Sequence, residues 1–151
     1  MEKKVYIAPG AVVTGEVQLG QNVSIWYGAV LRGDSGTISV GDDTNIQEGC
    51  ILHEQTTVGK GCTIGHGAII HGCTIGNNCL VGMGAIVLDG AVIGDDCLVA
   101  AGSLVTGKMD APAGSLLMGN PAKVIKPLTP EQIGANKTSA EHYVELAQKQ
   151  L

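Results

Sequence analysis

The stretch Thr63–Val81, TIGHGAIIHGCTIGNNCLV, decides the fold because an aliphatic residue returns in it every five or six positions. The same six-residue period runs through most of the chain, with one slip of three residues and one deletion of a single residue. The repeat positions are Ile7, Val13, Leu19, Ile25, Leu31, Val40, Ile46, Leu52, Val58, Ile64, Ile70, Ile75, Val81, Val87, Ile93, Val99 and Val105. All seventeen hold Ile, Leu or Val, so an internal repeat organises this chain.

A six-residue period is typical of a parallel β-helix, in which short strands meet at tight turns. It is too short for a helix-turn-helix repeat and too regular for a β-sandwich, whose turn signals lie about 8–12 residues apart. Three hexads make one triangular coil of about 18 residues, and neighbouring coils stack about 4.8 Å apart. We therefore predict an all-β fold, a parallel β-helix over residues 1–126.

After Val105 the repeat decays, and Thr129-Pro130-Glu131 reads as a helix start, with Thr as the cap and Pro in the first turn. Helical spacing of apolar residues predicts a C-terminal α-helix within residues 127–151 that packs on the β-helix as part of one domain. The predicted inward stripe is Ile133, Ala140, Val144, Ala147 and Leu151.

The composition fits a narrow interior. The chain has 23 Gly and no Phe, and a bore that admits one aliphatic and one small residue per side has no room for a benzyl group. Each of the five cysteines stands two residues before an aliphatic repeat position, which is the small inward site: Cys50, Cys62, Cys73, Cys79 and Cys97. We expect free, buried thiols, because no CxxC occurs.

Charge and hydropathy exclude several function classes. A net charge of -5 makes nucleic acid a poor partner, because phosphate binding needs an excess of Lys and Arg. A membrane-spanning helix needs about 18 consecutive apolar residues, and no apolar run in the chain is that long. The charged first residues also lack the apolar stretch of a secretory signal. We expect a cytoplasmic protein with no membrane partner.

The hexad frame predicts where three of the four histidines lie. Leu31, Leu52 and Ile70 fall on the same face of successive coils, so the residues that follow them, Arg32, His53 and His71, form one outward column. His53 and His71 can then converge on one ion, whereas His66 lies on another face. Catalytic zinc usually has three protein ligands, and a closed C3 trimer could bring His66 of a neighbouring chain to the pair. Surface histidines without metal are the alternative.

Other polar residues lie at the same level. Arg32 and Asp34 could form a pair that bridges chains, or an exposed ion pair of little energetic value. Gln47 could reach the metal of a neighbouring chain, while Asn45 could equally be a turn residue. For Trp26, we favour packing at a subunit interface over a catalytic role.

These motifs together resemble the gamma-class carbonic anhydrases over nearly the whole chain. The segments that carry the resemblance are Leu31-Arg32-Gly33-Asp34, Asn45-Ile46-Gln47, His53, Gly65-His66, His71-Gly72, Gly119-Asn120-Pro121-Ala122-Lys123 and the helix with Tyr143. The hexads and the Gly-Asn-Pro-Ala-Lys motif are also shared with hexapeptide acyltransferases.

The resemblance implies a left-handed β-helix, a homotrimer, and zinc, or iron or cobalt in its place, held by His53 and His71 of one subunit and His66 of the next. It implies an intersubunit Arg32–Asp34 pair, a Gln47 that orients the hydroxide at the metal, and reversible hydration of CO2 to bicarbonate. Tyr143 is a candidate site-lining group, with helix packing as the equal alternative.

The chain also departs from the family pattern. The founding members carry an acidic loop after the first His, whereas twelve residues separate His53 from His66 here, and Glu54 and Gln55 are poor replacements. Ser35 stands where those members have a second Glu. Low activity or a different proton shuttle is expected. A hexapeptide acyltransferase, an acyl-CoA thioesterase and a non-catalytic metal-binding trimer are the alternative functions.

Overall fold

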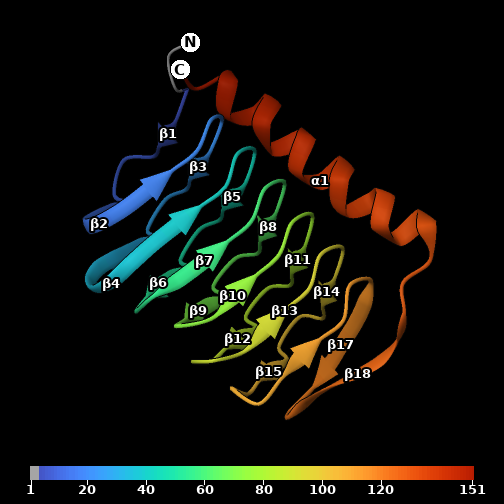
Figure 1. The fold of residues 1–151 in the computed structure, drawn as a ribbon. Helices are drawn as coiled ribbons and strands as arrows, with labels where there is room; N and C mark the ends of the chain where they lie inside the picture. Colours follow the sequence, from blue (N-terminus) through green and yellow to red (C-terminus); the bar gives the residue numbers. More distant parts are fainter. Residues whose placement is uncertain (1–3) are drawn as a thin grey trace.

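The computed structural model describes residues 4–151, so the start of the charged N-terminal stretch lies outside the described residues. It is a stack of triangular coils with one α-helix along its side (Figure 1), which confirms the predicted β-helix of hexapeptide repeats and its C-terminal helix. Within residues 4–151, no helix combines the length and the apolar character needed to cross a membrane.

One side of the prism, the helix-covered face, is an eight-stranded sheet that is parallel except for its last strand. Its strands are β1 (Tyr6–Ile7), β3 (Ser24–Ile25), β5 (Asn45–Ile46), β8 (Thr63–Ile64), β11 (Leu80–Val81), β14 (Leu98–Val99), β17 (Ser115–Gly119) and β18 (Ala122–Pro127).

The other two sides belong to one continuous sheet, because its two long strands, β2 (Val12–Leu19) and β4 (Val30–Val40), extend across the corner between them. The second side, here the apolar face, adds β6 (Ile51–His53), β9 (Ile69–His71), β12 (Ile86–Val87) and β15 (Leu104–Val105). The third side, here the polar face, adds β7 (Thr56–Val58), β10 (Thr74–Ile75), β13 (Val92–Ile93) and β16 (Asp110–Ala111).

The strand register confirms the hexad frame. Leu52 pairs with Ile70 one coil of 18 residues later, whereas the three-residue slip makes Leu31 pair with Leu52. The segment after Arg32, which contains the three-residue slip, continues β4, and the extra residues are absorbed as an irregularity in its pairing with β2.

The outward side chains distinguish the two uncovered faces. On the apolar face the outward row is aliphatic in every coil: Val12, Val30, Ile51, Ile69, Ile86 and Leu104. On the polar face the equivalent row is Gln18, Ser39, Thr57, Thr74, Val92 and Asp110. Ile51 is 41% exposed, so the apolar face presents aliphatic surface to its surroundings.

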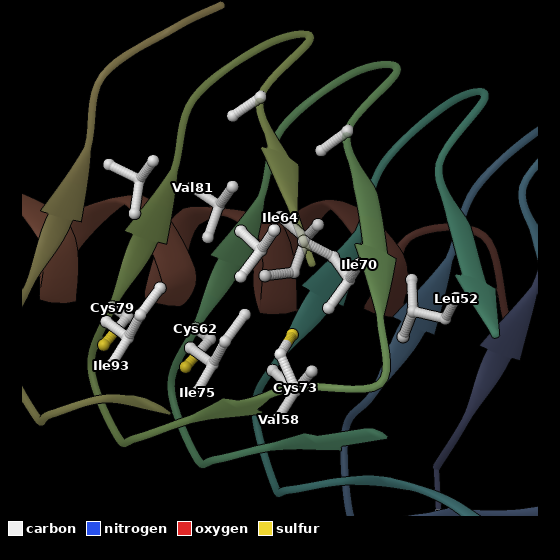
Figure 2. Packing of buried hydrophobic residues seen from close by; sticks show 14 of the residues in the cluster. Leu52, Val58, Cys62, Ile64, Ile70, Cys73, Ile75, Cys79, Val81 and Ile93 are labelled. Atoms are coloured by element: carbon white, nitrogen blue, oxygen red, sulfur yellow. The ribbon is translucent and has the colours of Figure 1, made fainter. Parts of the chain in front are cut away.

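The bore of the prism is the hydrophobic core. Fourteen of the seventeen repeat positions are buried, and the three that are not, Ile7, Val13 and Leu19, belong to the first coil. The five cysteines are free and buried, as predicted. Figure 2 shows Cys62 beside Ile75 and Cys79 beside Ile93 inside the coils. Four of the thiols also donate to backbone carbonyls: Cys50, Cys62, Cys79 and Cys97.

Helix α1 (Pro130–Gln148) begins at Thr129, whose side chain and Gln132 form a reciprocal capping box, as the sequence predicts for the cap. It runs back along the stack to the first coils (Figure 1). Ala140 and Ala147 face inward as expected. Leu151 does not, because the helix ends before it and its side chain is 64% exposed. The predicted stripe does not include Asn136, which is buried and donates to the carbonyls of Asn78 and Cys97.

Candidate metal centre

His53 and His71 stack one above the other at the corner where the apolar face ends. They close β6 and β9, which pair in parallel with His53 opposite His71. Nδ1 of His53 lies 3.3 Å from Nε2 of His71, and the two side chains are 14% and 34% exposed. The predicted column is therefore confirmed, and it sits on backbone that is fixed by the strand ladder.

The outer nitrogen of each ring faces an aspartate. His53 Nε2 lies 3.2 Å from Asp34 Oδ1, and His71 Nδ1 makes a short hydrogen bond to Asp89 Oδ1. An ionised carboxylate can only accept, so both outer nitrogens carry the hydrogen. With neutral rings, the two inner nitrogens then face each other with lone pairs, which repel unless one ring carries a second hydrogen or a metal ion lies between them.

This donor pair fits a divalent metal ion. Two nitrogens bound to one tetrahedral zinc at about 2.0–2.1 Å lie roughly 3.3 Å apart, the spacing found here. The carboxylates match the usual outer partners of metal-binding imidazoles, which fix the tautomer and the ring orientation. Gly72 makes room for one of them, because a Cβ at this position would lie 2.7 Å from the Asp89 carboxyl group.

Asp34 also binds Arg32 and Ser35. Arg32 Nη1 lies 2.9 Å from Asp34 Oδ2, and Ser35 Oγ donates to Asp34 Oδ1. Desolvation acts to raise the pKa of Asp34, but the hydrogen bonds from His53 and Ser35 and the charge of Arg32 outweigh it and lower that pKa. Within one chain, Arg32 and Asp34 form the exposed ion pair given as the alternative, and a pair between subunits stays a prediction.

Glu54 is the third potential ligand on this chain. Among the described residues, one group of three or more His, Cys, Asp and Glu side chains has ligand atoms mutually within 4.8 Å, and it consists of His53, Glu54 and His71. Glu54 Oε1 lies 3.7 Å from His53 Nδ1.

His66 lies at the opposite edge of the apolar face, in the turn between β8 and β9, and is separated from His71 by the whole of β9. Its side chain is 49% exposed, and its Nδ1 lies 2.9 Å from Glu48 Oε1, although the atoms are not aligned for a hydrogen bond. Within one chain, His66 therefore does not join His53 and His71.

The predicted polar residues Asn45 and Gln47 lie with His66 on the helix-covered side. Gln47 is 5% exposed and donates to Asn45 Oδ1, and Asn45 donates to Thr63 Oγ1. Gln47, His66 and Tyr143 line one open cavity of about 480 Å³. The predicted residues thus form two groups, one at each edge of the apolar face.

Tyr143 reaches this cavity from α1 and packs, edge-on, against Trp26 at 5.6 Å between ring centroids. The packing alternative is therefore confirmed, while a role in lining the metal site stays a prediction. Burial and the nearby charge of Glu48 raise the pKa of Tyr143, so its phenol stays protonated at neutral pH. Trp26 is 7% exposed in a cluster with Tyr6 and Ala147. It packs beneath the helix of its own chain, which accounts for its burial, and a contact with a second copy stays a prediction.

Asp89 and Glu48 were not predicted as site residues, although the repeat spacing indicates the position of each. Both Glu48 and Asp89 lie 18 residues, one coil, from the histidine they contact, Asp89 from His71 and Glu48 from His66. The rule that residues one coil apart lie in the same column, applied to carboxylates as well as histidines, predicts both contacts.

The comparisons with known proteins first establish a class. A family model described as bacterial transferase hexapeptide (six repeats) matches residues 37–72 and 72–107. The crystal structure of a hexapeptide transferase family protein from Anaplasma phagocytophilum is 46% identical, with a TM-score of 0.95, and the match covers 99% of this chain and 91% of that one. The chain is a hexapeptide-repeat protein.

The curated relatives establish the family. A protein named probable carbonic anhydrase from Methanocaldococcus jannaschii is 45% identical over 98% of this chain and 96% of the relative. Gamma carbonic anhydrase 2, mitochondrial, from Arabidopsis thaliana is 46% identical over 98% of this chain. The chain spans 57% of the length of that relative. It belongs to the gamma-class carbonic anhydrase family. Its cellular compartment stays a prediction, since the Arabidopsis relative is mitochondrial.

Proposed function

We propose that this protein is a zinc-dependent carbonic anhydrase that hydrates CO2 reversibly to bicarbonate. The observation that carries the proposal is the stacked pair His53 and His71, whose inner nitrogens lie 3.3 Å apart while each outer nitrogen is held by an aspartate. The family supports the same reading, because two relatives that match almost all of this chain are named carbonic anhydrases.

A homotrimer would complete the site. The apolar face presents an aliphatic row, with His66 at one edge and the His53–His71 pair at the other. When copies rotate about an axis parallel to the stack, one edge of each apolar face meets the opposite edge of the next. The same contact buries the aliphatic row and supplies His66 as a third ligand, and the family resemblance sets the number of copies at three.

Zinc held by His53, His71 and His66 of a neighbouring copy would supply a nucleophile for CO2, because the ion lowers the pKa of water towards neutrality. Asp34 and Asp89 hold the hydrogens of His53 Nε2 and His71 Nδ1 and so keep the inner nitrogens free to bind. Gln47, whose amide nitrogen donates to Asn45 Oδ1, would orient that nucleophile through its amide group. Tyr143, protonated at neutral pH, lines the cavity beside His66, and its hydroxyl would serve there as a hydrogen-bond donor.

The proposal is tested by metal analysis together with a CO2 hydration assay on the purified protein and on His53→Ala, His71→Ala and His142→Ala. His142 is exposed on α1, so its variant is a matched control. We expect about one zinc per chain in the wild type and in the control, and loss of both metal and hydration in the other two variants. Full hydration without metal, or in His53→Ala, would contradict the proposal. Stoichiometric zinc without hydration over a wide pH range would favour the non-catalytic trimer.

A second candidate is acyl transfer from coenzyme A or hydrolysis of an acyl-CoA thioester. The solved relative from Anaplasma phagocytophilum, described as a hexapeptide transferase family protein, favours it. The cavity lined by Gln47, His66 and Tyr143 has room for a substrate larger than CO2. This function predicts that coenzyme A raises the melting temperature, and that turnover survives complete removal of metal. The carbonic anhydrase proposal predicts neither result.

A further inference from the structure

We propose that Glu54 is a ligand for the same ion, so that a single chain holds the metal through His53, Glu54 and His71 before a neighbouring copy supplies His66. This inference rests on the proposed function for the two histidines and adds a third donor to them. In the assembled protein, His66 of the neighbouring copy takes the place of the carboxylate.

The first argument is geometric. The ligand atoms of His53, Glu54 and His71 lie mutually within 4.8 Å, which is close enough for one small ion to bind all three after minor side-chain movement. The Glu54 side chain is 34% exposed, and among the described residues its one ionisable partner within ion-pair distance is His53. The carboxylate therefore faces the inner side of the histidine pair, where the lone pairs lie.

The second argument is the backbone of Glu54. Its φ is +65°, in the left-handed region that residues other than Gly, Asn and Asp rarely adopt. The equivalent residue in the next coil, after His71, is Gly72, with a φ of +66°. A regular repeat would thus place Gly at position 54, and the glutamate found there leaves the backbone at this position strained. Such strain is found mainly where a side chain has a functional task.

The backbone at this turn is also well held. The carbonyl of His53 accepts hydrogen bonds from Thr56 Oγ1 and from the amide of Gly72 in the next coil. The backbone that carries Glu54 towards the histidine pair is therefore fixed by hydrogen bonds. Two imidazoles and one carboxylate are a common donor set for divalent zinc and iron.

Three protein donors on one chain have a consequence for assembly. A site that depended on His66 would be incomplete until copies met, with two imidazoles as its whole ligand set. With Glu54, each chain can bind the ion on its own, and the negative charge of the carboxylate adds attraction for a cation. His66 is then needed to complete the site in the assembly but not to capture the metal.

The test is a double-mutant cycle in metal affinity, measured by Co²⁺ titration of the metal-free protein with the visible absorption spectrum as the readout. The variants are His66→Ala, Glu54→Gln and the double variant, with His66→Ala/Glu141→Gln as the control because Glu141 is exposed on α1. We expect His66→Ala to bind about one Co²⁺ per chain, and the added Glu54→Gln change to weaken binding by on the order of 100-fold. Glu54→Gln alone should have a small effect, and the control none.

A further variant distinguishes loss of the carboxylate ligand from loss of folding stability. Glu54→Gly removes the carboxylate and relieves the strain at φ +65°, so in the metal-free protein we expect its melting temperature to stay the same or rise. Its Co²⁺ affinity in the His66→Ala background should fall as in Glu54→Gln.

The proposal is overturned if His66→Ala binds no Co²⁺, or if both Glu54 variants bind as tightly as His66→Ala itself. Failure of the proposed function looks different, because the wild-type protein would then bind no metal or would bind it without CO2 hydration.

Discussion

Asp89 of one coil holds the outer nitrogen of His71 in the coil before it, and Gly72 leaves the space through which it does so. Asp34, which comes from the coil before His53, lies against the outer nitrogen of His53. The pair of inner nitrogens, 3.3 Å apart, is thus set up by groups that would never touch the ion themselves.

The first prediction concerns these two carboxylates. Asp89→Asn and Asp34→Asn should each weaken zinc or Co²⁺ binding by about 10–100-fold, because the charge that fixes the imidazole tautomer is lost. The measurement is a competition titration against a chelator of known affinity. Asp110→Asn, on the polar face, is the charge-matched control and should leave the affinity unchanged. Equal affinity in all three variants would show that the aspartates do not position the histidines.

The second prediction concerns assembly. Ile51→Glu and Ile69→Glu place a charge in the aliphatic row of the apolar face and should reduce the mass in light scattering from about three chains of 15.4 kDa to one. The buried apolar area is the driving force for association, and an unpaired charge there is costly. Thr57→Glu, on the polar face, is the control. A trimer that persists in both apolar-face variants would place the interface elsewhere.

The third prediction concerns pH. Burial raises the pKa of the Cys50 thiol to about 11 and that of Cys73 to about 12, from an ordinary value near 9. Above pH 9 the unfolded chain loses these protons while the folded chain keeps them, so the free energy of unfolding falls as the pH rises towards 11–12. Each thiol contributes at most about 1.4 kcal/mol per pH unit.

Urea unfolding between pH 8 and 11 measures this decline, with the double variant Cys50→Ala/Cys73→Ala as the comparison. Alanine stands at the equivalent small site elsewhere in the repeat, for example at Ala68 and Ala85, so the variant should fold. We expect a shallower decline in the variant than in the wild type at equal protein concentration. Parallel curves would mean that the two thiols ionise as easily in the folded protein as in the unfolded one.

The fourth prediction concerns the narrow bore. Ile64 is fully buried, and Ile64→Phe should destabilise the protein by about 1–3 kcal/mol or more, since the added ring cannot be accommodated between coils whose spacing is fixed by strand hydrogen bonds. Ile64→Val should cost about 0.5–1.5 kcal/mol. Chemical unfolding of both variants tests whether overpacking is worse than a small cavity here, and the reverse order would mean that the bore is wider than its composition indicates.

The fifth prediction concerns the docking of the helix. Asn136 donates to the carbonyls of Asn78 and Cys97, at 3.2 and 3.0 Å, from a buried position on α1. Asn136→Ala leaves those turn carbonyls without these donors and should cost about 1–3 kcal/mol. Lys137→Ala, at an exposed neighbouring position, is the control and should change the unfolding free energy by less than about 0.5 kcal/mol.

The hexad pattern was sufficient to predict the β-helix and the face on which each repeat residue lies, because every coil obeys the same local rule. It therefore placed His53 directly below His71, and it placed His66 elsewhere. The start of the helix at Thr129-Pro130 could also be predicted, because capping depends on residues that are close together in the sequence. The same pattern could not show that the segment after Arg32 continues as a strand, because that depends on pairing with β2.

What the sequence determined by itself is thus the lattice: the period, the inward thiols, the absence of Phe and the histidine column. What the tertiary structure decided is which side chains meet: Asp34 and Asp89 on the outer imidazole nitrogens, Arg32 with Asp34 in one chain, and Trp26 under its own helix. The reason is physical. A repeat sets the backbone positions through local geometry and strand hydrogen bonds, whereas contacts between side chains depend on rotamers and on neighbouring coils, which are known only once the chain is folded.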